Sequence, residues 1–165
     1  MTYNMVPIKS QEQIEEFAKM AKIVWNEHFT SIIGKAQVDF MLEKFQSEHA
    51  VTEQINNQGY KYYFIEIEGN KVGYYGIHEE EENLFLSKLY IMKDHRKKGY
   101  ASLAFEFLRN MCKENGLKSI YLTVNKYNTD TIQVYEAKGF KIIKDQVSDI
   151  GNGFVMDDYV MELTI

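Results

Sequence analysis

The hydrophobic pattern of residues 84–111 predicts a strand, a loop and a helix in succession. Residues 84–92 (LFLSKLYIM) are rich in apolar and aromatic side chains without a helical stripe, which is typical of a strand buried on at least one face. Beyond a basic segment, apolar side chains return at helical spacing: Leu103, Ala104, Phe107, Leu108, Met111 and Cys112. The segment Arg96–Ala101 is therefore predicted to turn a strand into a helix.

The N-terminal third is predicted to be mainly helical. A short strand at residues 5–9 contains Pro7, which is tolerated only at a sheet edge or a strand start. Ser10 and Gln13 have the spacing of a capping box and begin a helix. Its apolar face consists of Ile14, Phe17, Ala18, Ala21, Val24 and Trp25. A second helix is expected at 38–45 and a short third one at 51–55, with residues 29–34 between the first two.

The remaining segments predict strands and one more helix. Residues 60–67 and 72–77 are aromatic and β-branched, and the Gly69-Asn70 pair between them suits a tight two-residue turn. Residues 119–124 alternate as a strand does. They precede an Asn-capped helix that is expected to end at Gly139. Residues 140–147 and 153–163 are expected to be the last strands.

The segment Arg96–Ala101 has the chemistry of a diphosphate site. The first turn of a helix carries unpaired backbone N–H groups and a partial positive charge. Gly99 has no Cβ, so an anion can approach the backbone, and Arg96, Lys97 and Lys98 add full charges. Taken alone, one glycine after three basic residues equally suits a solvated loop. Neither GxxxxGK[ST] nor GxGxxG is present, which argues against the better-known nucleotide loops.

A second motif resolves this ambiguity in favour of a known family. Arg96–Ala101 resembles the R/Q-x-x-G-x-G/A loop of the GNAT superfamily of acyl-CoA N-acyltransferases, which holds the pyrophosphate of coenzyme A. Downstream, the chain is similar to the family segment N-x-x-A-x-x-[LF]-Y-x-x-x-G-F. Asn128, Tyr135 and Gly139-Phe140 match it, whereas Thr131 replaces the usual alanine. Residues 60–165 resemble the family well and the N-terminal helices do so in outline.

The resemblance implies an α/β (α+β) GNAT fold formed by a single domain over residues 1–165. Its mixed central sheet of about seven strands has helices on both faces. The strands at 84–92 and 119–124 are the fourth and fifth, and they are expected to splay apart. Acetyl-CoA is implied as the acyl donor, with its pantetheine arm in that gap. The residues expected to bind it are Leu89, Tyr90, Ile91, Arg96, Lys97, Lys98, Gly99, Tyr100, Ala101, Ser102, Asn125, Asn128 and Tyr135.

The same resemblance implies direct attack of an amine on the thioester. Tyr135 is expected near the sulfur as the general acid. With a phenol pKa of about 10 and a thiol pKa of about 8.5, full proton transfer is uphill by roughly 2 kcal/mol, so hydrogen bonding to the developing thiolate is the better description. The backbone N–H of Ile91 is the first candidate to stabilise the oxyanion. The base stays open among His78, Glu79 and Asp157, with Glu79 and Asp157 assigned as catalytic residues.

Overall composition limits the class of partner. The chain has 19 basic and 24 acidic residues and a formal charge of −5, which argues against a nucleic-acid binder and favours a cationic partner. One cysteine in 165 residues excludes an internal disulfide. No leader pattern, apolar run of about 18 residues or metal motif is visible, so a cytoplasmic protein without membrane or metal is expected.

The acceptor is expected to be a small amine. In order and character the chain is similar to the polyamine and diamine branch of the family, and the acidic residues 79–82 agree with a small polycation. His28, Trp25 and Phe29 of the first helix are candidates for the acceptor wall, although core packing explains Trp25 better. Two alternatives stay open: a protein or peptide N-acetyltransferase, and a non-catalytic acyl-CoA sensor. A homodimer is compatible with the family.

Overall fold

The protein is built around one mixed sheet. The computed structural model describes all 165 residues. Its seven strands are ordered β1-β2-β3-β4-β5-β7-β6, and only the β4–β5 pair is parallel. The elements in chain order are β1 (Tyr3–Pro7), α1 (Gln11–Ile33), α2 (Lys35–Phe45), α3 (Glu48–Asn57), β2 (Tyr60–Ile67), β3 (Asn70–Glu79), β4 (Asn83–Ile91), the short 3₁₀ helix η1 (Lys93–His95), α4 (Tyr100–Asn115), β5 (Ser119–Asn125), α5 (Thr129–Ala137), β6 (Lys141–Gly151) and β7 (Phe154–Thr164).

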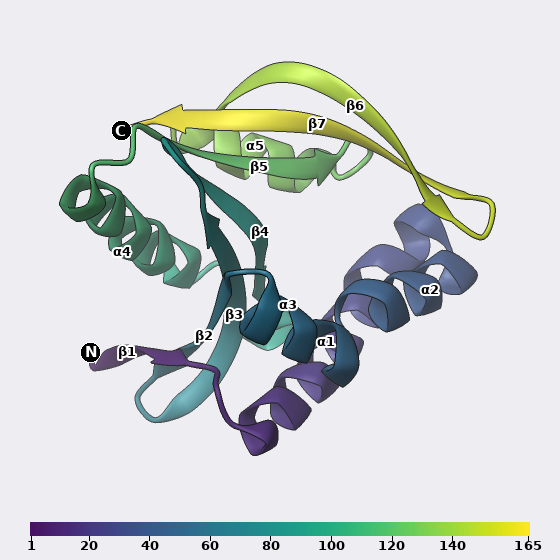
Figure 1. Ribbon diagram of the computed structural model, residues 1–165, viewed down its shortest axis with the longest axis horizontal. Helices are drawn as coiled ribbons and strands as arrows, with labels where there is room; N and C mark the ends of the chain where they lie inside the picture. Colours follow the sequence, from purple (N-terminus) through teal and green to yellow (C-terminus); the bar gives the residue numbers. More distant parts are fainter.

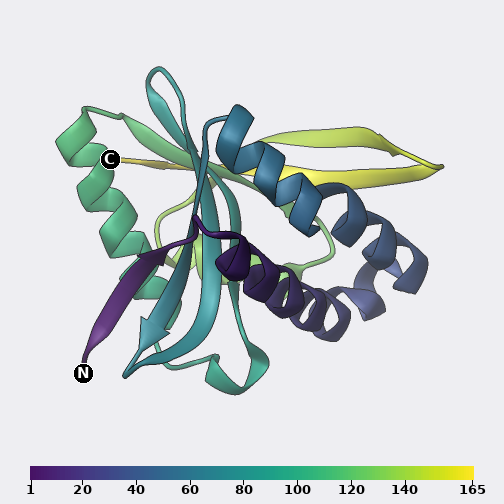
Figure 2. The ribbon, with the colours of Figure 1, turned by 60° about the horizontal axis from the view of Figure 1, so that its bottom comes forward.

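Helices cover both faces of the sheet, as expected from the sequence. In Figure 1, α1, α2 and α3 lie on one side of strands β2–β4 and α4 lies on the other, and Figure 2 shows the same separation from a second direction. Two separate hydrophobic clusters result, one of 19 buried residues on the α4 and α5 side and one of 15 on the α1–α3 side. The mixed, helix-covered architecture predicted from the sequence is confirmed.

Strand alternation explains how one sheet supplies both clusters. Along β2, Tyr62 and Phe64 join the α1–α3 cluster, whereas Ile65 joins the α4 cluster. Successive side chains of a strand point to opposite faces, so adjacent residues of β2 are buried against different helices. The ring of Phe17 in α1 packs edge-on against Tyr62 and Tyr74, with centroids 5.3 and 4.6 Å apart. These contacts fix α1 against the middle of the sheet.

The parallel strands β4 and β5 separate soon after they meet. They pair only from Asn83–Phe85 to Ser119–Tyr121, and β5 then continues its pairing with β7. Figure 1 shows the consequence, because β5 and β7 run across the top of the molecule while β4 descends away from them. A register shift opposite Gly76 and Ile77 leaves Ser87 of β4 without a partner in β3. The predicted splay between the fourth and fifth strands is confirmed.

Backbone alternation assigns the groups that face this gap. The N–H of Met92 donates to the carbonyl of Val72 in β3 at 2.8 Å. Along a strand, the backbone N–H and C=O of successive residues point alternately to the two neighbouring strands. The backbone groups of Leu89 and Ile91 are therefore directed away from β3, toward the gap.

Three local predictions needed correction. The hairpin between β2 and β3 pairs Ile67 with Asn70, so its two turn residues are Glu68 and Gly69, and both have positive φ (49° and 80°). Residues 29–33 do not link two helices but form the last turn of α1. Asn128 precedes α5, yet its side chain makes no capping hydrogen bond. By contrast, the Ser10–Gln13 capping box is present with both of its hydrogen bonds.

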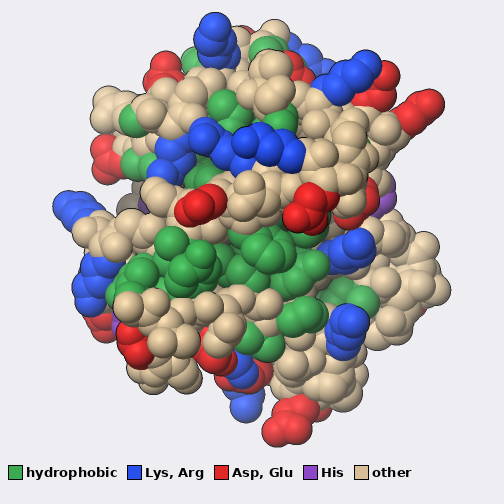
Figure 3. Space-filling view, turned by 90° about the vertical axis from the view of Figure 1, so that its left-hand side faces the viewer, with side chains coloured by type: hydrophobic (Ala, Val, Ile, Leu, Met, Phe, Trp, Pro, Cys, Tyr) green, Lys and Arg blue, Asp and Glu red, His purple; other side chains and the backbone are tan.

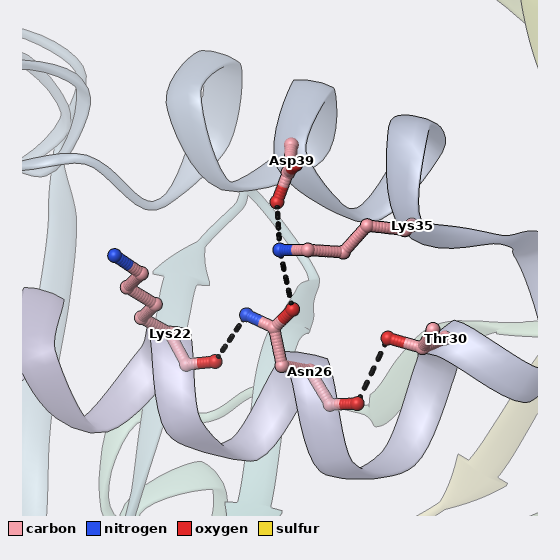
Figure 4. Close-up of polar contacts among 5 residues, drawn as sticks. All are labelled: Lys22, Asn26, Thr30, Lys35 and Asp39. Atoms are coloured by element: carbon pink, nitrogen blue, oxygen red, sulfur yellow. Dashed lines mark hydrogen bonds and ion pairs between the residues drawn. The ribbon is translucent and has the colours of Figure 1, made fainter.

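A polar cluster joins α1 to α2 at the sharp corner between them. The Nζ of Lys35 lies 2.8 Å from the Oδ1 of Asn26 and 2.6 Å from the Oδ1 of Asp39 (Figure 4). Asn26 also donates to the carbonyl of Lys22 at 2.8 Å and its own carbonyl accepts from the Thr30 hydroxyl at 2.8 Å. One ammonium thus links the start of α2 to α1, and both helices face the cavity described below.

The face of the molecule that carries β1 and α4 has an apolar region. Figure 3 shows hydrophobic side chains gathered on the side of the molecule where β1 and α4 lie, with Lys and Arg side chains next to them. Tyr3 of β1 and Phe107 of α4 are among the exposed large hydrophobic residues, with exposed fractions of 44% and 36%. No helix is both long enough and apolar enough to span a membrane.

Candidate active site

The basic loop between η1 and α4 is shaped for an anion. Lys97 and Gly99 adopt left-handed backbone conformations, with φ of 63° and 81°. No side chain caps the N-terminus of α4, so the first-turn N–H groups have no side-chain acceptor. An added Cβ on Gly99 would meet no atom within 4 Å, which shows that this backbone is open to a ligand. The loop is tied to β4 because the Nε of Arg96 donates to the carbonyl of Ile91 at 2.9 Å.

A large cavity runs from this loop through the gap between β4 and β5. Its volume is about 870 Å³, and it reaches the inner faces of α1, α2 and α3. Among the residues that line it are all those predicted to bind the donor except Lys98. Lys98 is exposed on the loop. The predicted donor-binding residues that line the cavity come from β4, the loop, α4, β5 and α5. The structure therefore brings together residues as far apart in the sequence as Leu89 and Tyr135, which are 46 positions apart.

Lys138 adds a basic group that the sequence did not reveal. Its Nζ lies 2.5 Å from the Oγ of Ser102 in the first turn of α4, and 5.4 Å from the ring centroid of Phe105. Burial lowers its pKa, and the neighbouring charge of Arg109 lowers it further. The position directly before Gly139 carried no recognisable signal. The basic surroundings of the loop consequently include a lysine from the end of α5.

Three polar side chains meet where the cavity passes through the sheet. Tyr90 of β4, Tyr135 of α5 and Asp158 of β7 all line the cavity. Burial raises the pKa of Tyr90, and the negative charges that Tyr135 and Asp158 can carry raise it further. Burial alone raises the pKa of Tyr135 to about 12. Both phenols therefore keep their protons at neutral pH and can donate hydrogen bonds.

Asp158 is the buried carboxylate of this site. Only 3% of its surface is exposed, and it pairs with Asn125 at the end of β5. Burial, and then the neighbouring charge of Asp157, raise its pKa to about 6, while Lys126 acts in the opposite direction. The group is therefore mostly ionised at pH 7 but close enough to its pKa to exchange a proton.

The two acidic residues expected as the base lie outside the cavity lining. Asp157 is adjacent to Asp158 and so points to the other face of β7, where its Oδ1 lies 2.8 Å from the Nζ of Lys126. Glu79 contacts Lys61 at 3.3 Å and Asn115 at 3.5 Å. Strand alternation could have separated Asp157 from Asp158, but only with knowledge of which face of β7 meets the cavity.

His78, the third candidate base, also belongs to a different cluster. Its Nδ1 lies 3.3 Å from the Oε2 of Glu80, and the hydroxyl of Tyr121 donates to the Oε1 of the same carboxylate at 2.6 Å. None of these three side chains lines the cavity. Glu80 therefore joins His78 and Tyr121 in a hydrogen-bonded network at the turn between β3 and β4.

The first helix supplies one wall of the cavity, which Trp25, His28 and Phe29 line. Trp25 also belongs to the α1–α3 cluster, in agreement with core packing. Trp25 and Phe29 pack against each other with centroids 4.3 Å apart, and both contact Tyr90 edge-on. The Nε2 of His28 lies 3.3 Å from the Oδ1 of Asn128, which is why that asparagine does not cap α5. Burial and then the charge of Arg96 lower the pKa of His28, so this imidazole is neutral at pH 7.

Comparisons with known proteins agree with this architecture. Residues 19–140 match the model of the Acetyltransferase (GNAT) family. An uncharacterized N-acetyltransferase in the pepI 3' region of Lactobacillus delbrueckii subsp. lactis is 20% identical over 151 residues, which cover 87% of each chain. The PaiA N-acetyltransferase of Thermoplasma acidophilum, in complex with coenzyme A, has a TM-score of 0.81, 16% identity and complete coverage of both chains. Mutant forms of the spermidine/spermine N-acetyltransferase SpeG from Vibrio cholerae have a TM-score of 0.67 and 18% identity, and the match covers 99% of this chain and 95% of that one.

Proposed function

The chain belongs to the acetyltransferase (GNAT) family, and on that premise we propose that it transfers an acetyl group to the primary amine of a small molecule. Family membership makes it an acyltransferase that uses acetyl-CoA as donor. The acceptor proposal rests on one observation: a carboxylate with 3% exposure, Asp158, lies in the same cavity as Tyr90 and Tyr135. A buried anion beside hydrogen-bond donors is suited to bind an ammonium group and to accept a proton from the amine during its attack.

The donor would be held at the basic end of the cavity. Arg96, Lys97 and Lys138 supply positive charge there, and the uncapped first turn of α4 supplies backbone N–H donors for a diphosphate. The backbone groups of Leu89 and Ile91 are directed to the gap, where they can pair with the amide groups of a pantetheine arm. When bound, acetyl-CoA supplies an activated acyl group whose thioester these contacts would hold close to Tyr135.

Tyr135 is proposed to act on the departing thiolate. Its phenol stays protonated at neutral pH because burial raises its pKa to about 12. A phenol this weakly acidic stabilises a thiolate mainly through a hydrogen bond rather than by complete proton transfer. The N–H of Ile91 is proposed to hydrogen-bond to the carbonyl oxygen where negative charge develops. In this proposal both donors are present before reaction, so little reorganisation is needed.

Asp158 is proposed as the base in place of Glu79 and Asp157. Its pKa of about 6 makes it an anion at pH 7, so it attracts an acceptor ammonium into the cavity. An alkyl ammonium has a pKa of about 10 and does not give its proton to such a carboxylate spontaneously. Because an ammonium has no lone pair, it first loses a proton to solvent, and the free amine attacks the carbonyl. The nitrogen becomes cationic and its pKa falls as the new bond forms, so it then gives its excess proton to Asp158. Proximity supplies much of the remaining rate.

A polyamine acceptor is a finer hypothesis with weaker support. The formal charge of −5 favours a polycation in general. The likeness to the SpeG enzyme is at 18% identity and carries the fold alone. Among the cavity-lining side chains the acidic ones are buried Asp158 and exposed Asp130, so a second ammonium of a polyamine would have no buried partner. We therefore propose a primary amine without specifying a polycation.

The test is release of free thiol from acetyl-CoA, with the acetylated product identified by mass spectrometry. The acceptors are amino acids, their decarboxylated amines, diamines, spermidine, spermine, aminoglycosides and short peptides. Saturable turnover of a small amine supports the proposal. Turnover of peptides alone would favour the peptide N-acetyltransferase, and acetyl-CoA binding without any acetylated product would favour the sensor. The homodimer and the cytoplasmic location remain predictions.

A further inference from the structure

The acceptor side of the cavity contains a buried lysine that the proposed reaction does not use. Lys88 of β4 is only 7% exposed, yet it lines the cavity together with Gln54, Gln58 and Tyr60. It lies two residues before Tyr90, so both side chains project from the same face of β4, toward α1–α3. The unmatched Ser87 beside it marks the strand irregularity at this position.

Neutral groups surround this ammonium. Its Nζ donates to the Tyr62 hydroxyl at 2.6 Å, the Ser87 hydroxyl at 3.2 Å and the Gln54 Oε1 at 3.4 Å. The Nζ also lies 5.0 Å from the ring centroid of Tyr62 and 5.9 Å from that of Tyr60. Thus Tyr60 and Tyr62 face it from β2 and Gln54 faces it from α3. No carboxylate is within salt-bridge distance of it.

A buried ammonium without a counter-charge is unfavourable. Its transfer from water costs several kcal/mol unless an anion compensates, and proteins otherwise respond by releasing the proton. Burial lowers the pKa of Lys88 to about 7, which agrees with such an environment. A leucine would fill this strand position without that cost. Because Lys88 borders a cavity rather than a packed core, an anionic ligand can reach it.

We propose that the end of the cavity lined by Gln54, Gln58, Tyr60 and Lys88 binds an anionic group of the acceptor, in the simplest case a carboxylate. This inference rests on the proposed function and narrows its substrate class. Successive same-face residues of a strand are roughly 7 Å apart, so Lys88 is about that far from Tyr90 along β4. The anion-binding end is therefore close to the part of the cavity that Tyr90 and Asp158 line. The cavity would then bind an amine at Asp158 and an anion at Lys88, which is the pattern of an amino acid or a related amino carboxylate.

Matched acceptor pairs test this directly in the wild-type enzyme. Lysine and cadaverine, arginine and agmatine, or histidine and histamine differ only in the α-carboxylate. The expected result is that kcat/KM for the carboxylate-bearing member of at least one pair is higher by roughly tenfold or more, as expected for a hydrogen bond to a charged group. A phosphate-bearing amine, phosphoethanolamine, is compared with ethanolamine to establish which anion is preferred. Equal values within every pair would overturn the inference.

The variant Lys88→Met assigns the preference to this side chain. It should bring the ratio within the preferred pair close to one while turnover of the decarboxylated amine is retained. Lys61→Met is the control, because Lys61 is exposed on β2 and contacts Glu79 outside the cavity. If the ratio persists in Lys88→Met, or if kcat falls equally for both members of the pair, the inference is wrong. Thermal unfolding of both variants checks that they fold.

A binding measurement separates this inference from the acetyltransferase activity itself. Calorimetry at pH 8, in two buffers of different ionisation enthalpy, measures proton uptake when each acceptor binds the wild-type protein. An anion next to Lys88 favours its protonated form, so Lys88 should take up a proton when the carboxylate-bearing ligand binds. That ligand should therefore bind more weakly as the pH rises above 7. Lys88-dependent binding without turnover would refute the proposed function alone. Turnover without any preference for an anion would refute this inference alone.

Discussion

The Nε of Arg96 lies 2.9 Å from the carbonyl oxygen of Ile91, so one hydrogen bond joins the basic loop to the end of β4. The two regions proposed to bind the donor, the diphosphate loop and the pantetheine gap, are thereby held in a fixed relation. Arg96 also carries the charge that lowers the pKa of His28 across the cavity. This arginine therefore has a structural contact and an electrostatic one in the same site.

Replacing Arg96 with methionine should weaken acetyl-CoA binding. The variant loses one charge beside the diphosphate and the hydrogen bond to β4, and charged hydrogen bonds contribute about 1.5–3 kcal/mol. We expect the Kd for acetyl-CoA to rise by roughly tenfold to a hundredfold, measured by calorimetry. Lys93→Met is the control, since Lys93 is exposed on η1 and does not line the cavity. The same increase in both variants would mean that only net charge matters.

A carboxylate base at Asp158 predicts a break in the pH profile. Because its pKa is about 6, kcat/KM should fall as the pH decreases below about 6, where the group becomes protonated. Asp158→Asn should lower kcat/KM by about a hundredfold or more and remove this break. Steady-state rates between pH 5 and pH 9, at saturating acetyl-CoA, provide the measurement.

The neighbouring aspartate gives a matched control with its own expected shift. Asp157 raises the pKa of Asp158 by its negative charge, so Asp157→Asn should move the break to lower pH while activity at pH 8 changes little. If Asp157→Asn were the inactive variant and Asp158→Asn the active one, the base would be on the other face of β7. That result would restore the expectation made from the sequence.

Gly73 should be required for the position of β4. A Cβ at this residue would lie 2.3 Å from the carbonyl oxygen of Tyr90, so Gly73→Ala must displace the strand that borders the gap. We expect a loss of about 1–3 kcal/mol in the free energy of unfolding and a raised KM for acetyl-CoA. Gly76→Ala is the comparison, because its Cβ would meet the Tyr62 ring at 2.5 Å instead. Gly76→Ala should destabilise the fold similarly but raise the KM for acetyl-CoA less. Equal KM values in the two variants would argue against a specific role of Gly73 in positioning β4.

The residues predicted to bind the donor lie together at the cavity, except Lys98, and their sequence signals are local. The strand, the basic loop and the helix are contiguous, and loop conformations such as that of Gly99 depend on neighbouring residues. The second motif places Tyr135 on its helix by spacing alone. Lys98, also predicted to bind the donor, lies outside the cavity lining, because charge in a loop does not determine which side chain faces inward.

The acceptor side could not be predicted because it depends on tertiary contacts. Asp157 and Asp158 are equivalent in sequence, and the pairing of Asp158 with Asn125 is what places it at the cavity. Lys88 lies in an apolar strand and is buried by α3, a helix that the family resemblance describes only in outline. Neither charge pattern nor periodicity indicates a buried ammonium without a counter-charge.

The central claim is that Tyr135 assists acetyl transfer in this cavity, and single-turnover kinetics tests it most directly. With enzyme in excess over acetyl-CoA and the best amine saturating, Tyr135→Phe should transfer the acetyl group about a hundredfold or more slowly than the wild type, with an almost unchanged Kd for acetyl-CoA. Tyr127→Phe, which changes an exposed tyrosine, should behave as the wild type. Equal single-turnover rates in the Tyr135→Phe variant and the wild type would contradict the account.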